Sequence, residues 1–337
     1  MPRTYRVIMI GFGSVGRGFA QIIQRKQAWL EAQHGVTITI VGIATRSNCL
    51  YDQAGIDLVA LLEAYERGAT ILPSTQPWSP AELIAHSQAD LLVEVSPTDL
   101  ATAEPATSYI RAAIACGMHV ITANKGPVAL HGPELRALAT ERGLGFGYEA
   151  TVMAGTPALR LGWGALAGCE LHELRGIVNG TTNYMLSQME HGMTYEAALA
   201  EAQRLGYAET DPTGDVEGFD AAAKAAILAT MLMGGNLRPD DVQRVGITKL
   251  TPENIATAAA ANERWKLIAR VTKTPAGISA SVEPTRVPIT HVLASVGGAT
   301  NALTYTTDLL GDVTLIGPGA GGVATGFALL ADILALA

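Results

Sequence analysis

The stretch from Tyr5 to Gly16, YRVIMIGFGSVG, joins an apolar run to a glycine-rich turn and decides the fold class. Its first half has the composition of a buried strand, and a helical pattern follows from Arg17 to about Leu30. Between them stands the pattern G-x-G-x-x-G, formed by Gly11, Phe12, Gly13, Ser14, Val15 and Gly16. Glycines in this setting permit a tight turn and close approach to a pyrophosphate, which the helix N-terminus then holds. The stretch predicts a dinucleotide-binding fold.

Strands and helices continue to alternate up to about residue 150. We expect strands at Val36–Ala44, Asp90–Val95, Met118–Thr122 and Leu144–Glu149, and helices at Ala103–Cys116 and Pro133–Arg142. This order is typical of an α/β fold with a doubly wound parallel sheet of the Rossmann type. The sequence therefore predicts a first, cofactor-binding domain over residues 1–150.

After Glu149 the alternation ends in a turn-rich connector. We expect a helix at Tyr195–Leu205 and strands at Trp265–Val271, Ile278–Val282, Leu303–Thr307 and Val313–Ile316, with a hairpin turn before the last. These elements predict a second, α+β domain over residues 151–316. Residues 317–337 form a third segment, in which the glycine-rich loop GPGAGG precedes an apolar helix.

Several residues at expected strand ends are candidates to bind the cofactor. Arg46 follows the second strand, where an NAD-preferring site would have Asp or Glu, and its charge suits a 2′-phosphate. We therefore predict a preference for NADP(H) over NAD(H); the alternative is a solvated loop arginine. Ser96 and Lys125 follow the next strands, although Lys125 fits a surface loop equally well. Gly321 would approach the cofactor from the second glycine loop, unless that loop is only a flexible turn.

The stretch from Gly206 to Ala229, GYAETDPTGDVEGFDAAAKAAILA, carries the main catalytic candidates. Asp220 and Lys224 stand four residues apart and so share one face of a helix. Such pairs are mostly solvated surface pairs, but this helix has almost no polar face and should be buried. A buried lysine needs a partner or loses its proton, so the pair is a candidate for proton transfer.

The carboxylates that precede this helix do not form a calcium loop. A template started at Asp211 has Val216 where glycine is required, so it fails. Carboxylates beside an active site suit a cationic substrate, for instance the ammonium of an amino acid. The polar run Asn179–Asn183 offers donors to a ligand or merely forms a turn, and the residues alone favour the turn.

Composition excludes several classes of function. The chain has 337 residues, of which 48% are hydrophobic and 16% charged, as in an ordinary globular enzyme. Its net charge of −8, with no Lys/Arg cluster, argues against a nucleic-acid partner. The longest apolar runs, Ala225–Met233 and Phe327–Ala337, are too short to span a membrane. The N-terminus lacks the pattern of a secretory signal, so we expect a cytoplasmic protein.

Four stretches together resemble the homoserine dehydrogenase family, and the resemblance extends over nearly the whole chain. They are GFGSVG at Gly11–Gly16, TANKGPVA at Thr122–Ala129, GIVNGTTNYML at Gly176–Leu186 and YAETDPTGDVEGFDAAAK at Tyr207–Lys224. The resemblance implies NAD(P)-dependent interconversion of L-homoserine and L-aspartate 4-semialdehyde, a step toward threonine, methionine and isoleucine. It also implies a homodimer formed through the second domain, and a closing segment, residues 317–337, whose helix returns to the nucleotide-binding domain. The chain is similar to short forms, without aspartokinase or ACT domains, so we expect no threonine feedback through such a domain.

The resemblance further implies roles for individual residues. Lys224 would exchange the proton of the substrate hydroxyl, with Lys125 and Asp220 close by. The residues expected to hold homoserine are Glu209, Asp215, Gly180, Thr181 and Tyr207. The family also carries a monovalent cation, usually sodium, on backbone carbonyls, which here would be those of Glu149, Val152, Ala154 and Thr156. Met153-Ala154 departs from the small, glycine-rich residues usual in that connector.

Two alternatives remain open from the sequence. A Rossmann-type enzyme that reduces another amino-acid semialdehyde would share the cofactor loop but would not need the NGTTNYML and YAETDPTGD motifs. A non-catalytic NADP-binding sensor would be expected to have lost Lys224 or Asp220, and this chain has both.

Overall fold

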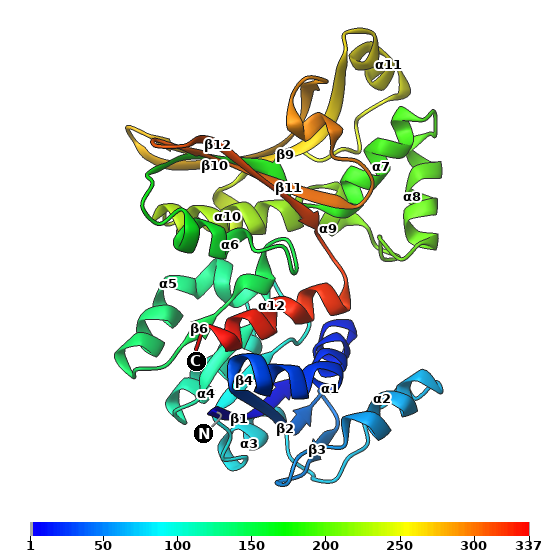
Figure 1. Cartoon of the computed structure of the whole chain (residues 1–337). Coiled ribbons are helices and arrows are strands. Elements are labelled where there is room, and N and C mark those ends of the chain that lie inside the picture. The colour runs from blue at the N-terminus through cyan, green and yellow to red at the C-terminus, as the bar shows by residue number, and fades with distance from the viewer. Residues whose placement is uncertain (1–2, 337) are drawn as a thin grey trace. The chain divides into compact units, whose positions relative to one another are not determined.

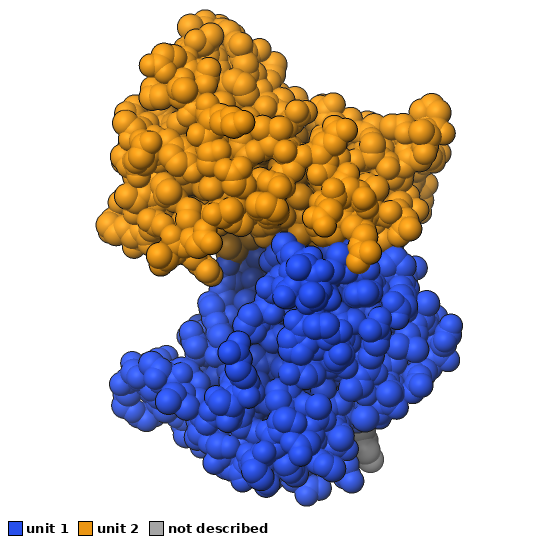
Figure 2. Space-filling view, turned by 180° about the vertical axis from the view of Figure 1, so that it is seen from behind, with its two compact units in different colours: residues 1–155, 321–337 blue, residues 156–320 orange. Residues whose placement is uncertain are grey.

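The computed structural model describes residues 3–336 and divides the chain into two compact units (Figure 1, Figure 2). The first unit comprises residues 1–155 and 321–337, and the second comprises residues 156–320. The chain thus passes from one unit to the other at Gly155 and back at Gly321, whereas the sequence suggested divisions after residues 150 and 316. The first unit is therefore built from both ends of the chain.

The sheet of the first unit has the strand order β3-β2-β1-β4-β5-β6. Its strands are β1 (Arg3–Ile10), β2 (Val36–Ala44), β3 (Cys49–Tyr51), β4 (Leu91–Glu94), β5 (His119–Thr122) and β6 (Phe146–Gly147). All pairs are parallel except β2 with the edge strand β3. This confirms the predicted doubly wound sheet. The strand order reverses between β1 and β4, and ligands of such sheets bind at that point, beyond the carboxyl ends of the strands.

Helices cover both faces of this sheet. They are α1 (Ser14–His34), α2 (Leu58–Glu66), α3 (Pro80–His86), α4 (Ala106–Ala115), α5 (Lys125–Glu141) and α12 (Gly322–Leu334). One apolar core cluster contains residues of α1 and α12, and another contains residues of α3, α4 and α5. Glycines allow α12 to pack directly on α1, since a Cβ added at Gly18 would lie 2.2 Å from the carbonyl oxygen of Gly322.

The sheet of the second unit has the order β12-β11-β7-β9-β10-β8. Its strands are β7 (Leu171–Ile177), β8 (Gln243–Arg244), β9 (Glu263–Thr274), β10 (Gly277–Pro288), β11 (Thr300–Thr307) and β12 (Gly311–Pro318). Every pair is antiparallel except β8 with β10. Gly311 has φ +67° in the turn between β11 and β12, which confirms the predicted hairpin.

The helices of the second unit pack against its sheet or against one another. They are α6 (Ala158–Arg160), α7 (Gly180–Glu190), α8 (Tyr195–Arg204), α9 (Thr213–Val216), α10 (Phe219–Met233) and α11 (Pro252–Ala260). Both α7 and α10 contact β9, and Figure 1 shows them alongside the sheet. No helix within residues 3–336 combines the length and apolar character that a membrane span requires.

Two elements differ most from the sequence-based expectations. The strand expected at Leu144–Glu149 is only Phe146–Gly147, and Glu149 begins a short 3-10 turn, η1 (Glu149–Thr151). Helix α5 begins at Lys125 rather than at Pro133, because Asn124 caps it by accepting a hydrogen bond from the Gly126 N–H. Lys125 therefore lies in the first turn of a helix and not in a loop.

Candidate active site

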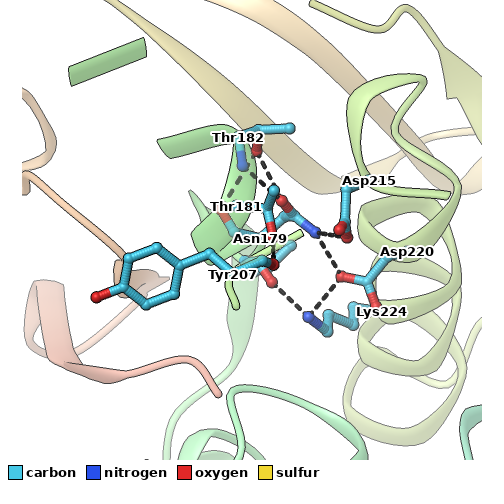
Figure 3. Close-up of polar contacts among 8 residues, drawn as sticks. Asn179, Thr181, Thr182, Tyr207, Asp215, Asp220 and Lys224 are labelled. Carbon is cyan, nitrogen blue, oxygen red and sulfur yellow. Dashed lines mark hydrogen bonds and ion pairs between the residues drawn. The ribbon is translucent and has the colours of Figure 1, made fainter. Parts of the chain in front are cut away.

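The first turns of α10 place Asp220 and Lys224 on one helix face, as their spacing predicts. The helix begins after Gly218, whose φ of +80° favours glycine, and most of its residues are buried. Lys224 is only 8% exposed, which confirms that it is a buried lysine. Its Nζ donates to Asp220 Oδ2 at 2.6 Å and to the carbonyl oxygen of Val178 at 2.7 Å (Figure 3).

Asn179 connects the two carboxylates of the site. Its Nδ2 donates to Asp215 Oδ1 at 2.6 Å and to Asp220 Oδ2 at 2.9 Å (Figure 3). Its Oδ1 accepts from the N–H of Thr182 at 2.9 Å, so the same side chain caps α7. The turn favoured for Asn179–Asn183 was therefore wrong, because these residues begin a helix. An asparagine followed by an apolar-periodic run is a helix-start signal, and it could have been recognised in the sequence.

Asp215 and Asp220 are held close together with limited access to water. Burial raises the pKa of the Asp215 carboxyl above its ordinary value of 3.8, and the neighbouring charge of Asp220 raises it further. The hydrogen bond from Asn179 and the charge of Lys224 act in the opposite direction. A carboxylate pair bridged by an amide and paired with a buried lysine is typical of a site that binds cations or transfers protons.

The other residues expected to bind the substrate differ in burial and in their hydrogen-bond partners. Thr181 is buried, and its Oγ1 donates to the carbonyl oxygen of Tyr207 at 2.6 Å, which joins the start of α7 to the carboxylate loop (Figure 3). The Tyr207 side chain is 44% exposed and lies near the ring of Tyr184. Glu209 is exposed, and its carbonyl oxygen accepts from Gln203 Nε2. Hydrogen bonds thus link Asp215 through Asn179 to Asp220 and Lys224, whereas Glu209 lies outside this group.

In the first unit, the three glycines of the G-x-G-x-x-G turn have distinct surroundings. A Cβ at Gly11 would lie 2.4 Å from the carbonyl oxygen of Val95, and one at Gly16 would lie 2.8 Å from that of Gly11. A Cβ at Gly13 would meet nothing within 4 Å. Gly11 and Gly16 thus permit the tight turn and close packing, and Gly13 leaves backbone open to a ligand. This is the arrangement that a pyrophosphate requires at the N-terminus of α1.

The remaining cofactor candidates lie at the same edge of the first unit's sheet. Arg46 is exposed just beyond β2, and Ser96 follows β4. Gly321 precedes α12, whose first residue, Gly322, packs on the backbone of Ser14. The second glycine loop therefore reaches the first. The side chain of Phe12 is buried against Tyr65, so Phe12 offers a ligand only its backbone.

The connector expected to hold a cation has an unusual backbone. Met153 and Ala154 have φ of +59° and +51°, which is costly for residues other than glycine. The carbonyl oxygens of Glu149 and Thr156 accept the N–H groups of Val152 and Ala158, respectively. Val152 and Ala154 are buried outside any helix or strand, so their carbonyls are not committed to a regular ladder. Within residues 3–336, no group of three or more His, Cys, Asp or Glu side chains is placed to hold a metal ion.

Comparison with known proteins assigns both halves of the chain. Residues 11–149 match the family model "Homoserine dehydrogenase, NAD binding domain", and residues 157–334 match the model "Homoserine dehydrogenase". The NAD(+)-dependent homoserine dehydrogenase of Pseudomonas canavaninivorans is 44% identical over 98% of this chain and 95% of its own length.

Two solved structures have the same fold. A homoserine dehydrogenase from Thiobacillus denitrificans has a TM-score of 0.86 at 34% identity, covering 99% of this chain and 73% of the other. A hyperthermophilic archaeal homoserine dehydrogenase in complex with NADPH has a TM-score of 0.83 at 31% identity, covering 98% of this chain and 97% of the other.

Proposed function

The chain belongs to the homoserine dehydrogenase family and catalyses the NAD(P)-dependent interconversion of L-homoserine and L-aspartate 4-semialdehyde, and we propose that Lys224 transfers the proton. The observation that carries this proposal is the buried ion pair of Lys224 with Asp220, at 2.6 Å. The cofactor, when bound, supplies or accepts the hydride. The residues of this chain then need to bind the amino acid and to move one proton.

In the direction of reduction, the aldehyde carbon gains a hydride and its oxygen becomes an alkoxide. The ammonium of Lys224 has three N–H donors. Within the described part of the chain, two of them donate to Asp220 and to the carbonyl oxygen of Val178. The third can donate to the substrate oxygen, which stabilises the developing charge and completes the alcohol. Oxidation of homoserine runs through the same steps in reverse. Asp220 orients the lysine, and Lys125, at the start of α5, is proposed to assist it.

We propose that Asp215 receives the ammonium of homoserine. Asn179 fixes this carboxylate at 2.6 Å, so the carboxylate is oriented before a ligand arrives. The start of α7 contributes Gly180 and Thr181, and Tyr207 and Glu209 from the carboxylate loop complete the proposed set. The second unit would thus hold the amino acid, and the first unit the nucleotide.

An assay of L-homoserine-dependent reduction of NADP+ and NAD+ tests this function. In Lys224→Met we expect kcat to fall by a factor of about 10²–10⁴, the usual contribution of a general acid–base group, with NADPH affinity unchanged. Lys273→Met is the matched control, because Lys273 is half-exposed on β9 and pairs with Glu170. A Lys224→Met enzyme that lost homoserine affinity but kept its turnover would contradict the proposed role.

We propose that the enzyme prefers NADP(H) over NAD(H). Family membership does not decide this point, since one relative is named as NAD(+)-dependent and one neighbour was solved with NADPH. The support comes from Arg46, an exposed cation just beyond β2, in a segment (Thr45–Asn48) that has no acidic residue. A guanidinium there can bind a 2′-phosphate, whereas a carboxylate would repel it.

Replacement of Arg46 by Asp tests this preference. The ratio of kcat/KM for NADP+ to that for NAD+ should fall at least about tenfold, which corresponds to the loss of one charge-assisted contact. Arg25→Asp, on an exposed position of α1, controls for the change in net charge. An unchanged ratio in Arg46→Asp would exclude Arg46 as the discriminating residue.

We also propose that a monovalent cation, such as sodium, binds at the connector. The carbonyls of Val152 and Ala154 support this, because the positive φ of Met153 and Ala154 turns the backbone out of any regular ladder. Glu149 and Thr156 complete the set that the resemblance implies. That same resemblance supports a homodimer, a cytoplasmic location and a role in synthesis of threonine, methionine and isoleucine.

A further inference from the structure

Glu94, the last residue of β4, is fully buried and lies at the centre of a polar network. Its Oε1 accepts from the N–H of Ser96 at 2.9 Å and also from the Ser96 hydroxyl. Its Oε2 accepts from Thr122 Oγ1 at 3.0 Å. Burial raises the pKa of Glu94, and the hydrogen bonds from its neighbours oppose that shift. A buried carboxyl group is costly to a fold, so its place at this edge of the sheet needs an explanation.

The hydrogen bonds form a closed ring across the ends of two neighbouring strands. Glu94 of β4 pairs in register with Thr122 of β5. The Thr122 hydroxyl accepts from the Asn124 N–H at 2.9 Å, and Asn124 Nδ2 donates to the carbonyl oxygen of Ser96 at 3.3 Å. The Ser96 N–H donates to Glu94, which closes the ring. The ring therefore fixes both loops that leave these strands, and Asn124 is also the cap of α5.

The position of this ring in the sheet indicates which part of the cofactor it serves. The glycine turn after β1 and Arg46 after β2 lie on one side of the switch point, where the pyrophosphate and the adenosine ribose bind. Strands β4 and β5 lie on the other side, which binds the second nucleotide of a dinucleotide. Two candidate cofactor contacts stand at this point: Ser96 is itself a member of the ring, and Lys125 directly follows its member Asn124.

We propose that Glu94 is a positioning residue, which holds the ends of β4 and β5 in the arrangement that receives the nicotinamide half of the cofactor. This inference rests on the proposed cofactor contacts of Ser96 and Lys125. It assigns Glu94 no contact with the cofactor and no part in proton transfer. Its effect is transmitted through the backbone of Ser96 and the side chain of Asn124.

The test compares two ligands that differ in the nicotinamide ring. Binding of NADPH and of 2′-phospho-ADP-ribose, which lacks nicotinamide, is titrated without substrate. In Glu94→Leu, which leaves the Ser96 and Thr122 donors without their acceptor, we expect the Kd of NADPH to rise about tenfold, while that of 2′-phospho-ADP-ribose stays unchanged. Glu94→Gln keeps one acceptor oxygen and should restore part of the NADPH affinity. NADH and ADP-ribose, the corresponding ligands without the 2′-phosphate, are titrated and compared in the same way.

Thr107→Val is the matched control. Thr107 is fully buried in the same unit, and its hydroxyl donates to the carbonyl oxygen of Ala103, four residues earlier in the chain and outside the ring. This variant should leave both dissociation constants unchanged. Where Glu94→Leu fails to fold, Thr122→Val breaks the ring from the opposite strand and should give the same difference between the ligands. Equal losses for both ligands, or none, would overturn the inference. Homoserine-dependent turnover by the unmodified protein tests the enzymatic function separately.

Discussion

Lys266 is a second buried lysine, in β9, and it serves the fold rather than the proposed chemistry. It is 1% exposed, and its Nζ donates to the carbonyl oxygen of Val296 at 2.8 Å and to Asn183 Oδ1 at 3.2 Å. Asn183 Nδ2 in turn donates to three carbonyls of the segment 296–300. Lys266 and Asn183 therefore clamp this segment beside α7.

Burial lowers the pKa of Lys266 below its ordinary value of 10.5. The unfolded chain then binds more protons than the folded chain between the lowered pKa and 10.5. The free energy of unfolding should therefore rise with pH in that interval, by up to about 1.4 kcal/mol per pH unit, and fall as pH drops through the folded pKa. We predict that the free energy of unfolding of Lys266→Met does not show this rise with pH.

Urea unfolding at a series of pH values between neutrality and 10.5 measures the effect. The difference in unfolding free energy between the unmodified protein and Lys266→Met should grow in favour of the unmodified protein as pH increases. Lys273→Met, on the exposed part of the same strand, separates the effect of burial from that of net charge. A difference that stays constant with pH would contradict the prediction.

Residue by residue, the sequence revealed those parts of the site whose geometry is local. Asp220 and Lys224 are separated by one helical turn, so their spacing alone placed them together. Asn179 and Val178 meet the same pair from 41 and 46 residues away along the chain. No short-range pattern encodes such a contact, because it depends on how β7 and α10 pack in the second unit.

At the scale of elements, periodic and well-terminated segments were predicted best. The strand expected at Val36–Ala44 has those bounds in the structure, and the helix expected at Tyr195–Leu205 is α8, Tyr195–Arg204. Both have strong signals, an apolar run in β2 and an amphipathic face in α8. The βαβ alternation predicted the parallel, doubly wound sheet of the first unit, whereas the order of its strands is known only from the structure.

Elements with conflicting local signals were placed less well. The helix expected at Pro133–Arg142 begins earlier, at Lys125, and Pro127 lies in its first turn, where its missing N–H costs nothing. Pro133 remains inside the helix, which shows tertiary packing prevailing over local propensity. Strand β6 is short because the chain turns after Gly147 and enters η1 at Glu149.

At the scale of the whole molecule, the first unit depends on a helix that the chain supplies last. Helix α12 buries Leu329, Leu330 and Ile333 in the same core cluster as residues of β1 and α1. Asp332 accepts the Glu149 N–H at 2.9 Å, which joins the helix to η1. Residues 1–155 alone would leave that apolar surface uncovered.

We predict that residues 1–155 do not fold alone, whereas the same residues joined to 321–337 through a short Gly/Ser linker do. Burial of the three large side chains contributes together about 4.5–9 kcal/mol, a large share of the roughly 5–15 kcal/mol that stabilises a typical domain. A short linker suffices because Gly155 already lies against α12: a Cβ there would be 2.3 Å from the carbonyl oxygen of Ala324.

Thermal unfolding followed by circular dichroism distinguishes the two chains, and titration with 2′-phospho-ADP-ribose shows whether the folded one keeps its nucleotide site. The linked chain should unfold cooperatively and bind this ligand as the intact protein does, because the glycine turn and Arg46 belong wholly to the first unit. Cooperative unfolding of residues 1–155 without α12 would show that the core does not need the returning helix. Failure of the linked chain while the intact protein folds would instead mean that residues 156–320 stabilise the first unit, so that its folding is not independent.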